Sequence, residues 1–187
     1  MTRQKKPQLS PIPDDLLTTV MEPYQAREAR YLQTAQTHVT NTCWRAEGRF
    51  SIGSSSYIRN TGHFNAAEFV ICFNQLFYAL VAHGTDRGLI PELRHWDLDE
   101  FQRNQLPSIL IRKLESAYLA PIDGASFTGT IVVENPSIVE RRRRYVHAPA
   151  TVHFTGDESD TSGKPGTATG TVDIAILLDD ERVGATQ

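Results

Sequence analysis

The residues best suited to chemistry lie in one stretch, from Tyr57 to Glu68, just before and inside a long apolar segment. Gly62 and His63 immediately precede that segment, which we expect to be a helix. The first backbone N–H groups of a helix lack intrahelical partners, and the helix dipole is positive there. Such an end can hold a carbonyl oxygen that becomes negative during a reaction. A thioester carbonyl that turns into an enolate or a tetrahedral oxyanion is a group of this kind.

His63 stands at the mouth of this expected site. A histidine there can act as a general base or as a hydrogen-bond donor. It can equally cap the helix or bond a backbone carbonyl, and the residue type alone does not decide between these roles.

Polar side chains interrupt the apolar segment. Asn65 and Glu68 lie three residues apart and share a helix face, with Gln75 roughly on the same side. Buried polar groups need partners, so these residues either line a site or bond the surrounding strands. For Glu68 we favour a catalytic role, because a buried carboxylate is costly without a function or a cationic partner.

Asn74 points roughly away from Asn65 and lies about 13–14 Å further along the helix axis. The two residues cannot serve the same reacting atom within one subunit. Asn74 therefore either anchors the helix or contributes to substrate binding further down an acyl tunnel, at a subunit boundary.

Other candidates lie outside the helix. Tyr24 and Tyr57 stand beside loop-like segments, where a phenol can donate to a carbonyl or carboxylate, although packing alone also explains both. Arg59 can hold an anionic group or be an ordinary surface charge. Arg112 and Lys113 fall within an expected strand, so their side chains should point to opposite faces, one of them inward or towards a partner.

A run of arginines at 141–144 should also alternate between faces if it lies in a strand. Its outward pair can attract the phosphates of coenzyme A or an acidic carrier protein. A solvated edge strand, kept charged against aggregation, explains the run at least as well.

Composition excludes several classes of function. The net charge of −3 over 187 residues argues against nucleic-acid binding, which depends on clustered positive charge. Cys43 and Cys72 are too few for a disulfide framework or a four-ligand zinc site, so buried reduced thiols are expected. Phosphate-binding glycine loops, nucleophile elbows and metal-binding His/Cys spacings are missing, so we expect no cofactor and no metal.

The pattern of elements predicts an α+β domain of the hot-dog type, an antiparallel sheet wrapped around one long central helix. We expect a disordered tail at 1–11, a single domain at 12–180 and a flexible tail at 181–187. Within the domain, a short helix opens at Asp14 and ends near Met21, and the apolar segment at 64–82 and residues 97–106 form two more helices. Strands are expected at 30–40, 42–52, 109–119, 127–134, 141–154 and 167–178.

The apolar segment is long enough to be mistaken for a membrane span. It carries Asn65, Glu68, Asn74 and Gln75, which are costly in lipid, so a buried core helix is the better interpretation. Prolines follow the basic N-terminal residues where a signal peptide needs an apolar core. We therefore expect a cytoplasmic protein without a membrane span.

The chain resembles the FcoT family of hot-dog proteins over roughly residues 12–178. The resemblance rests on Glu22-Pro-Tyr24, Tyr57-Ile-Arg, Thr61-Gly-His-Phe-Asn65, Cys72-Phe-Asn-Gln-Leu76 and Leu110-Ile-Arg-Lys113. It implies functional positions at Tyr24, Tyr57, Asn65 and Asn74, with His63 inside the same motif. Arg142 and Arg143 depart from the family pattern.

The resemblance implies an enzyme that acts on a fatty acyl thioester. The family is named for hydrolysis of long-chain acyl-CoA, whereas related proteins of isonitrile-lipopeptide pathways add glycine to a 2-enoyl thioester on an acyl carrier protein. Michael addition suits the residues better, since His63, Tyr24, Tyr57 and Arg59 can handle an ammonium and a carboxylate. We therefore expect glycine addition, with Arg59, Asn74, Arg112 and Lys113 binding substrate.

Two other functions compete with this expectation: a thioesterase on the same fold, and a non-catalytic module that binds acyl thioesters or docks a carrier. The expected partners are an acyl carrier protein or coenzyme A thioester, glycine, and further copies of the chain. The resemblance implies a homo-oligomer, either a dimer or a trimer of dimers.

Overall fold

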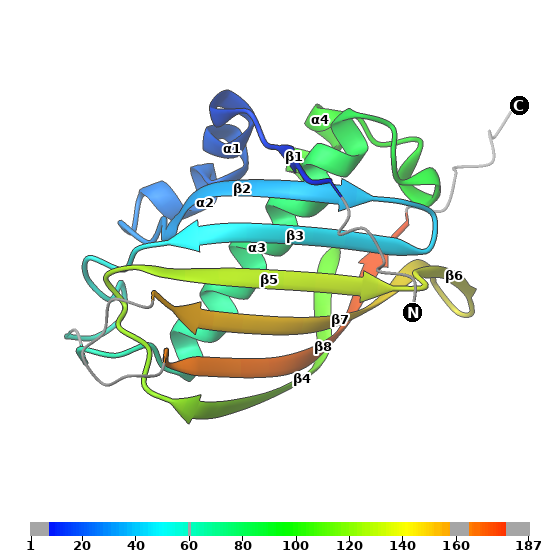
Figure 1. Ribbon diagram of the computed structural model, residues 1–187. Coiled ribbons are helices and arrows are strands. Elements are labelled where there is room, and N and C mark those ends of the chain that lie inside the picture. The colour runs from blue at the N-terminus through cyan, green and yellow to red at the C-terminus, as the bar shows by residue number, and fades with distance from the viewer. Residues whose placement is uncertain (1–7, 60, 158–164, 179–187) are drawn as a thin grey trace, which may run out of the picture.

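The computed structural model describes residues 8–59, 61–157 and 165–178. One antiparallel sheet crosses the molecule and the long helix α3 lies against its concave side, as Figure 1 shows. The strand order is β1-β2-β3-β5-β7-β8-β4, with β6 paired to β7. The strands are β1 (Ser10–Pro11), β2 (Leu32–Val39), β3 (Cys43–Phe50), β4 (Ile109–Ala120), β5 (Phe127–Glu134), β6 (Ser137–Glu140), β7 (Arg144–Gly156) and β8 (Thr167–Leu177). The helices are α1 (Asp14–Val20), α2 (Glu22–Gln25), α3 (Ala66–Asp86), α4 (Leu98–Asn104) and a 3-10 turn, η1 (Pro91–Leu93). The expected hot-dog fold is confirmed.

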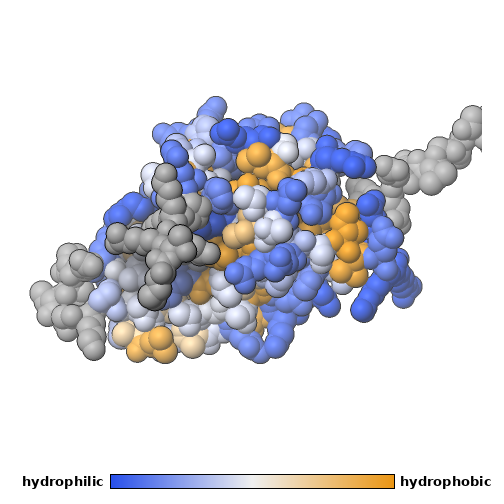
Figure 2. Space-filling view, turned by 45° about the vertical axis from the view of Figure 1, so that its right-hand side comes forward, coloured by the Kyte–Doolittle hydropathy of each residue, from blue (hydrophilic) through white to orange (hydrophobic). Residues whose placement is uncertain are grey.

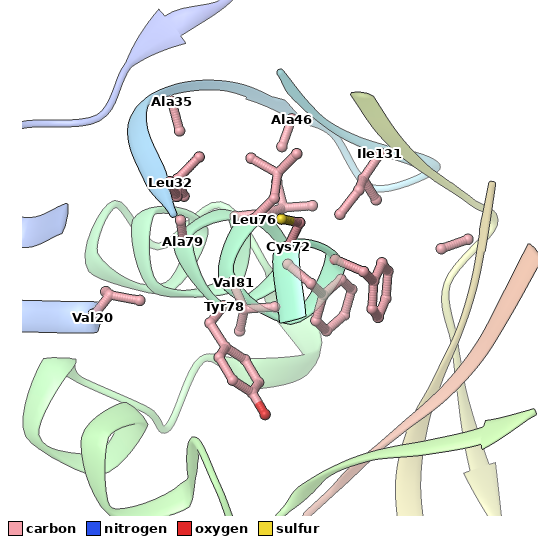
Figure 3. Close-up of a cluster of buried hydrophobic side chains, with 14 of the residues drawn as sticks. Val20, Leu32, Ala35, Ala46, Cys72, Leu76, Tyr78, Ala79, Val81 and Ile131 are labelled. Carbon is pink, nitrogen blue, oxygen red and sulfur yellow. The ribbon is translucent and has the colours of Figure 1, made fainter. Parts of the chain in front are cut away.

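Helix α3 is the centre of the hydrophobic core. Its sheet-facing side chains, among them Cys72 and Leu76, point toward Ala46 and Ile131 of the strands (Figure 3). By length and composition α3 would pass as a membrane span, but 72% of its most apolar window is buried. The interpretation of this segment as a buried core helix is confirmed.

Aromatic rings fill the end of the core nearest the start of α3. Phe64, Phe69, Phe127 and Phe154 contact one another in tilted and edge-to-face pairs with ring centroids 5.0–6.2 Å apart. Gly129 makes room for them, since a Cβ at this position would lie 2.6 Å from the Phe154 ring. The rings fix where the chain enters α3, because Phe64 stands two residues before its first residue.

The outer face of the sheet is polar. Along β7 buried and exposed side chains alternate, as expected for a strand with one face on the core. The face in Figure 2 is accordingly mostly hydrophilic, with apolar residues gathered in separate small patches.

Strand β4 differs from the other long strands because both of its faces are open. After Ile109 its residues are exposed or half-buried throughout, and Leu119 keeps 71% of its surface. An exposed edge strand with apolar side chains offers its unpaired backbone groups to another chain.

The structure corrects three expectations about the chain path. Ser10 and Pro11 were expected in a disordered tail but form β1 on the edge of β2, where a proline without an N–H is tolerated. Tyr24 was expected just beyond the first helix but lies in the extra turn α2, which begins at Glu22 and has Pro23 at its start. The arginines at 141–143 form the exposed turn between β6 and β7 instead of strand. The expected tail at 181–187 lies outside the described residues.

Candidate active site

The start of α3 is built by its capping residue, Asn65. The Asn65 side-chain oxygen accepts from the N–H groups of Ala67 and Glu68 at 2.9 and 3.4 Å, and the Glu68 carboxylate accepts from the Asn65 N–H at 3.0 Å. This reciprocal pair is a capping box, which satisfies backbone donors that a helix otherwise leaves open. Gly62, with a φ of +78°, supplies the left-handed turn that leads the chain into this cap.

Tyr57 joins the cap from the preceding loop. Its hydroxyl donates to Asn65 Oδ1 at 2.8 Å, so this oxygen accepts from one phenol and two backbone N–H groups. Because the oxygen is held by three donors, the orientation of the carboxamide is fixed by its partners. Within the described part of the chain Asn65 Nδ2 has no hydrogen-bond partner, so it stays available to a ligand.

Glu68 is buried, with 2% of its surface exposed, and both of its oxygens are used. One accepts from the Ser55 hydroxyl at 2.5 Å and the other from the Asn65 N–H at 3.0 Å. The carboxylate therefore ties the loop at Ser55 to the start of α3. Ser56 adds a second tie, since its N–H donates to the buried Tyr31 hydroxyl at 3.0 Å.

His63 is exposed and lies on the rim of a cavity of about 390 Å³ at the start of α3. Asn65 and Ala66 line this cavity on the helix side, and Tyr118 and Leu119 of β4 line it opposite. The His63 Nδ1 atom lies 3.2 Å from the Thr61 carbonyl oxygen. The predicted grouping of His63, Tyr57, Asn65 and the helix end is thus present in the structure.

Tyr24 of α2 and Asn74 of α3 lie away from the start of α3. Tyr24 packs on the core from α2, and burial together with the neighbouring Tyr78 and Cys72 raises its pKa well above the ordinary value. Asn74 is half-buried, nine residues after Asn65, which places it about 13–14 Å further along the axis. One subunit therefore holds two separate polar groups along α3.

Two expectations about the helix are decided by its contacts. The Gln75 side chain accepts from the Tyr31 and Leu32 N–H groups and donates to the Ala29 carbonyl at 2.6 Å, so it anchors the start of β2. Cys72 is fully buried, and burial raises the pKa of its thiol, which keeps it protonated.

The basic residues expected to bind substrate do not join either group. Arg59 is exposed in the loop before Thr61. The Arg112 guanidinium lies 3.5 Å from Asp173, and Lys113 lines a cavity with Asp173 on the outer face of the sheet. The expectation that Arg112 and Lys113 point to opposite faces is wrong, because a bulge in β4 inserts Arg112 as an extra residue opposite β8.

Sequence reasoning missed Ser55 and Tyr31. Neither carries a local signal, because Ser55 meets Glu68 only after the loop folds back onto the helix. The spacing of Asn65 and Glu68 did contain a signal, since it matches a capping box. Among the described residues no cluster of three or more His, Cys, Asp or Glu side chains is placed to hold a metal ion.

Residues 19–176 match the family described as the FcoT-like thioesterase domain. The chain belongs to this family. Among curated FcoT-like relatives, a (2E)-enoyl-ACP glycyltransferase of Mycobacterium marinum is 39% identical over 89% of this chain and 87% of its own length. The protein of that name from Mycobacterium tuberculosis is also 39% identical, over 89% of this chain and 88% of its own length. One from Streptomyces coeruleorubidus is 41% identical over 61% of this chain and 68% of its own length.

Solved structures similar to this FcoT-like chain are distant in sequence. A thioesterase family protein from Silicibacter pomeroyi is 12% identical with a TM-score of 0.47, covering 87% of this chain and 98% of that chain. A thioesterase from Pseudomonas aeruginosa is 12% identical with a TM-score of 0.44, covering 94% and 98%.

Proposed function

We propose that this protein adds glycine to the β-carbon of a 2-enoyl group held as a thioester on an acyl carrier protein. The observation that carries the proposal is the fixed Asn65 carboxamide at the start of α3, whose oxygen is occupied and whose Nδ2 donor is available at the cavity. The FcoT-like relatives named (2E)-enoyl-ACP glycyltransferase, similar over most of the chain, support it.

The start of α3 suits the charge that develops in this addition. The glycine amine forms a bond to C3, the C2–C3 π bond opens, and its electrons move to the thioester oxygen as an enolate. Asn65 Nδ2 stabilises that oxygen together with the Ala66 N–H, which the cap leaves without a partner in the described residues and which lies at the same cavity. C2 then takes a proton and the amine loses one, so the C–S bond stays intact and no oxidant is needed.

His63 is the proposed base for the glycine ammonium. It is exposed on the rim of the same cavity, where an imidazole can accept the proton from an incoming amine. Tyr57 keeps its hydroxyl on Asn65 and so holds the carboxamide in its donating orientation.

Glu68 is better suited to positioning than to the catalytic role that the sequence favours. A thioesterase on this scaffold needs a carboxylate that is free to act as nucleophile or base. Both Glu68 oxygens already accept hydrogen bonds, from Ser55 and from the Asn65 N–H. This engagement favours addition over hydrolysis.

The working unit that we infer is a dimer in which each α3 completes the site of its partner. Asn65 and Asn74 are too far apart on one helix to meet at one substrate. A two-fold axis that runs the two helices antiparallel brings Asn74 of one subunit toward Asn65 of the other. The half-buried stripe of α3 at Val70, Ile71 and Asn74 and the exposed edge strand β4 provide surfaces for such an interface.

The thioester carrier, the extent of the domain and the location of the protein complete the proposal. We propose a carrier protein as the natural thioester donor, with coenzyme A as a poorer substitute, and a cytoplasmic location. The proposed single domain at 12–180 is extended at its start by strand β1. Arg59, Arg112 and Lys113 remain proposed binding residues, and the outward positions of Arg112 and Lys113 suit contact with the carrier protein better than with the acyl chain.

The experiment that tests the proposal follows the mass of a 2-enoyl thioester, on carrier protein and on coenzyme A, with enzyme in the presence and absence of glycine. A glycine-dependent gain of mass with the thioester intact is the expected result. Free acid released equally without glycine would select the thioesterase, and tight binding without any product would select a non-catalytic acyl-binding module.

A further inference from the structure

Tyr78 of α3 belongs to the polar group that lies away from the helix start, beside Asn74 of α3 and Tyr24 of α2. It lies one helical turn after Asn74, so the two side chains share a face of the helix. Figure 3 shows its ring on the side of α3 away from Ala46 and Ile131, with the hydroxyl oxygen directed out of the hydrophobic cluster. Tyr24 approaches the same region from α2, since Tyr78 and Cys72 are the groups that act on its phenol.

The three polar side chains of this group, Tyr24, Asn74 and Tyr78, are without hydrogen-bond partners in the described part of the chain. Tyr78 is the most enclosed of them, with 6% of its surface exposed. The Tyr78 hydroxyl oxygen is not among the fully enclosed atoms, so a ligand or water can reach it and supply the partner that a hydroxyl in such apolar surroundings requires. Gln75, on the adjacent face, shows the contrast, because backbone groups bond both its side-chain oxygen and its side-chain nitrogen.

The chemistry of the group is that of neutral donors. Burial raises the pKa of the Tyr78 and Tyr24 phenols, so both keep their protons at neutral pH and can donate. With Asn74 Nδ2 they make three donors in apolar surroundings, which match the two oxygens of a carboxylate.

We propose that Tyr78, together with Tyr24 and Asn74, binds the carboxylate of glycine, and that Tyr78 is a substrate-binding residue of the composite site. This inference rests on the proposed function and on the dimer in which the group faces the partner's α3 start. The thioester oxygen lies at the start of α3 of one subunit. The amino acid is bound by the group on the partner subunit. The amine then reaches C3 while its carboxylate stays on the phenols.

The test compares glycine with glycinamide, which has the same amine and lacks the carboxylate, as nucleophiles for a carrier-bound 2-enoyl thioester. In Tyr78→Phe we expect kcat/KM for glycine to fall about tenfold to a hundredfold, the loss of one hydrogen bond to a charged group, with glycinamide nearly unchanged. The ratio of the two nucleophiles is the readout, because a packing defect would lower both alike. Tyr145→Phe, which removes a phenol hydroxyl from the outer face of the sheet beside Arg112, is the matched control.

Two other outcomes are distinct. In the first, the wild-type enzyme adds glycine, and Tyr78→Phe lowers kcat/KM for glycine and glycinamide equally or for neither. This result overturns the assignment of Tyr78 and leaves the proposed function standing. A wild-type enzyme without any glycine-dependent product contradicts the proposed function and this inference with it.

Discussion

The Tyr57 hydroxyl donates to Asn65 Oδ1 over 2.8 Å, and this bond ties the loop before α3 to the residue that caps the helix. The same oxygen accepts the Ala67 N–H at 2.9 Å, so the cap and the phenol share one acceptor. The geometry of the helix end therefore depends on a side chain that is itself 43% exposed.

Tyr57→Phe removes that bond and leaves the ring. We expect turnover to fall about fivefold, because the loss of one hydrogen bond of ~1 kcal/mol loosens the Asn65 carboxamide. The free energy of unfolding should change by less than about 0.5 kcal/mol, as for other exposed positions. Turnover numbers and urea unfolding measure the two effects. A large loss of stability with normal turnover per folded molecule would contradict a positioning role.

Glu68 separates positioning from carboxylate chemistry. Glu68→Gln keeps one acceptor for the Asn65 N–H and an amide that can bond Ser55, so we expect most activity to remain. Glu68→Ala removes the Glu68 half of the capping box and the bond from Ser55, and should lower the free energy of unfolding by about 1–3 kcal/mol. If the glutamine variant were inactive while fully folded, the carboxylate would have a chemical role.

Mixed dimers test the composite site. Asn65→Ala and Asn74→Ala should each be nearly inactive alone. When the two are unfolded and refolded together, half of the dimers are mixed and each mixed dimer has one intact site, so about a quarter of wild-type activity should return. Sites confined to one subunit would give no recovery, since every subunit carries one defect.

Gly129 tests the aromatic core. In Gly129→Ala the new Cβ would lie 2.6 Å from the Phe154 ring and 2.9 Å from the Phe50 ring. We expect a loss of about 1–3 kcal/mol from overpacking. Gly53→Ala is the control, because its Cβ meets nothing within 4 Å. Equal unfolding midpoints for the two variants would show that the core relaxes without cost.

His83 gives the protein a pH dependence. Its Nδ1 lies 2.7 Å from Thr37 Oγ1, and burial holds its pKa below the ordinary value of 6.5. The unfolded chain then binds a proton that the folded protein does not, so the free energy of unfolding falls as pH drops through about 6.5. Urea unfolding should show that the free energy of unfolding falls between about pH 7 and pH 5. His83→Gln should reduce this dependence on pH, and substitution of the exposed His153 by Gln should leave it in place. A slope unchanged in His83→Gln would rule out this source.

The sequence predicts the elements of this fold better than their junctions. Strands such as Phe127–Glu134 follow from β-branched and aromatic runs, and the buried helix follows from its apolar composition. The edge strand at Ser10 and the bulge at Arg112 depend on pairing with a distant strand, which no local pattern encodes.

Some residues of the candidate site could be predicted from the sequence and others could not. Asn65, Tyr57 and His63 are adjacent in sequence, so their grouping at the helix start could be predicted. Ser55 could not be predicted, because a loop serine looks like an ordinary linker residue until its bond to Glu68 is seen. Tyr78 could not be predicted either, because a helical tyrosine looks like an ordinary core residue until its hydroxyl is seen to have no partner in the described part of the chain.

The most direct measurement incubates the enzyme with isotopically labelled glycine and either a 2-enoyl or a saturated acyl chain on the carrier protein, and records intact-protein mass spectra. We expect one labelled glycine on the 2-enoyl carrier, none on the saturated carrier, and a strongly reduced rate for Asn65→Ala. Release of free acid from both carriers at the same rate, with no label retained, would contradict addition and establish a thioesterase.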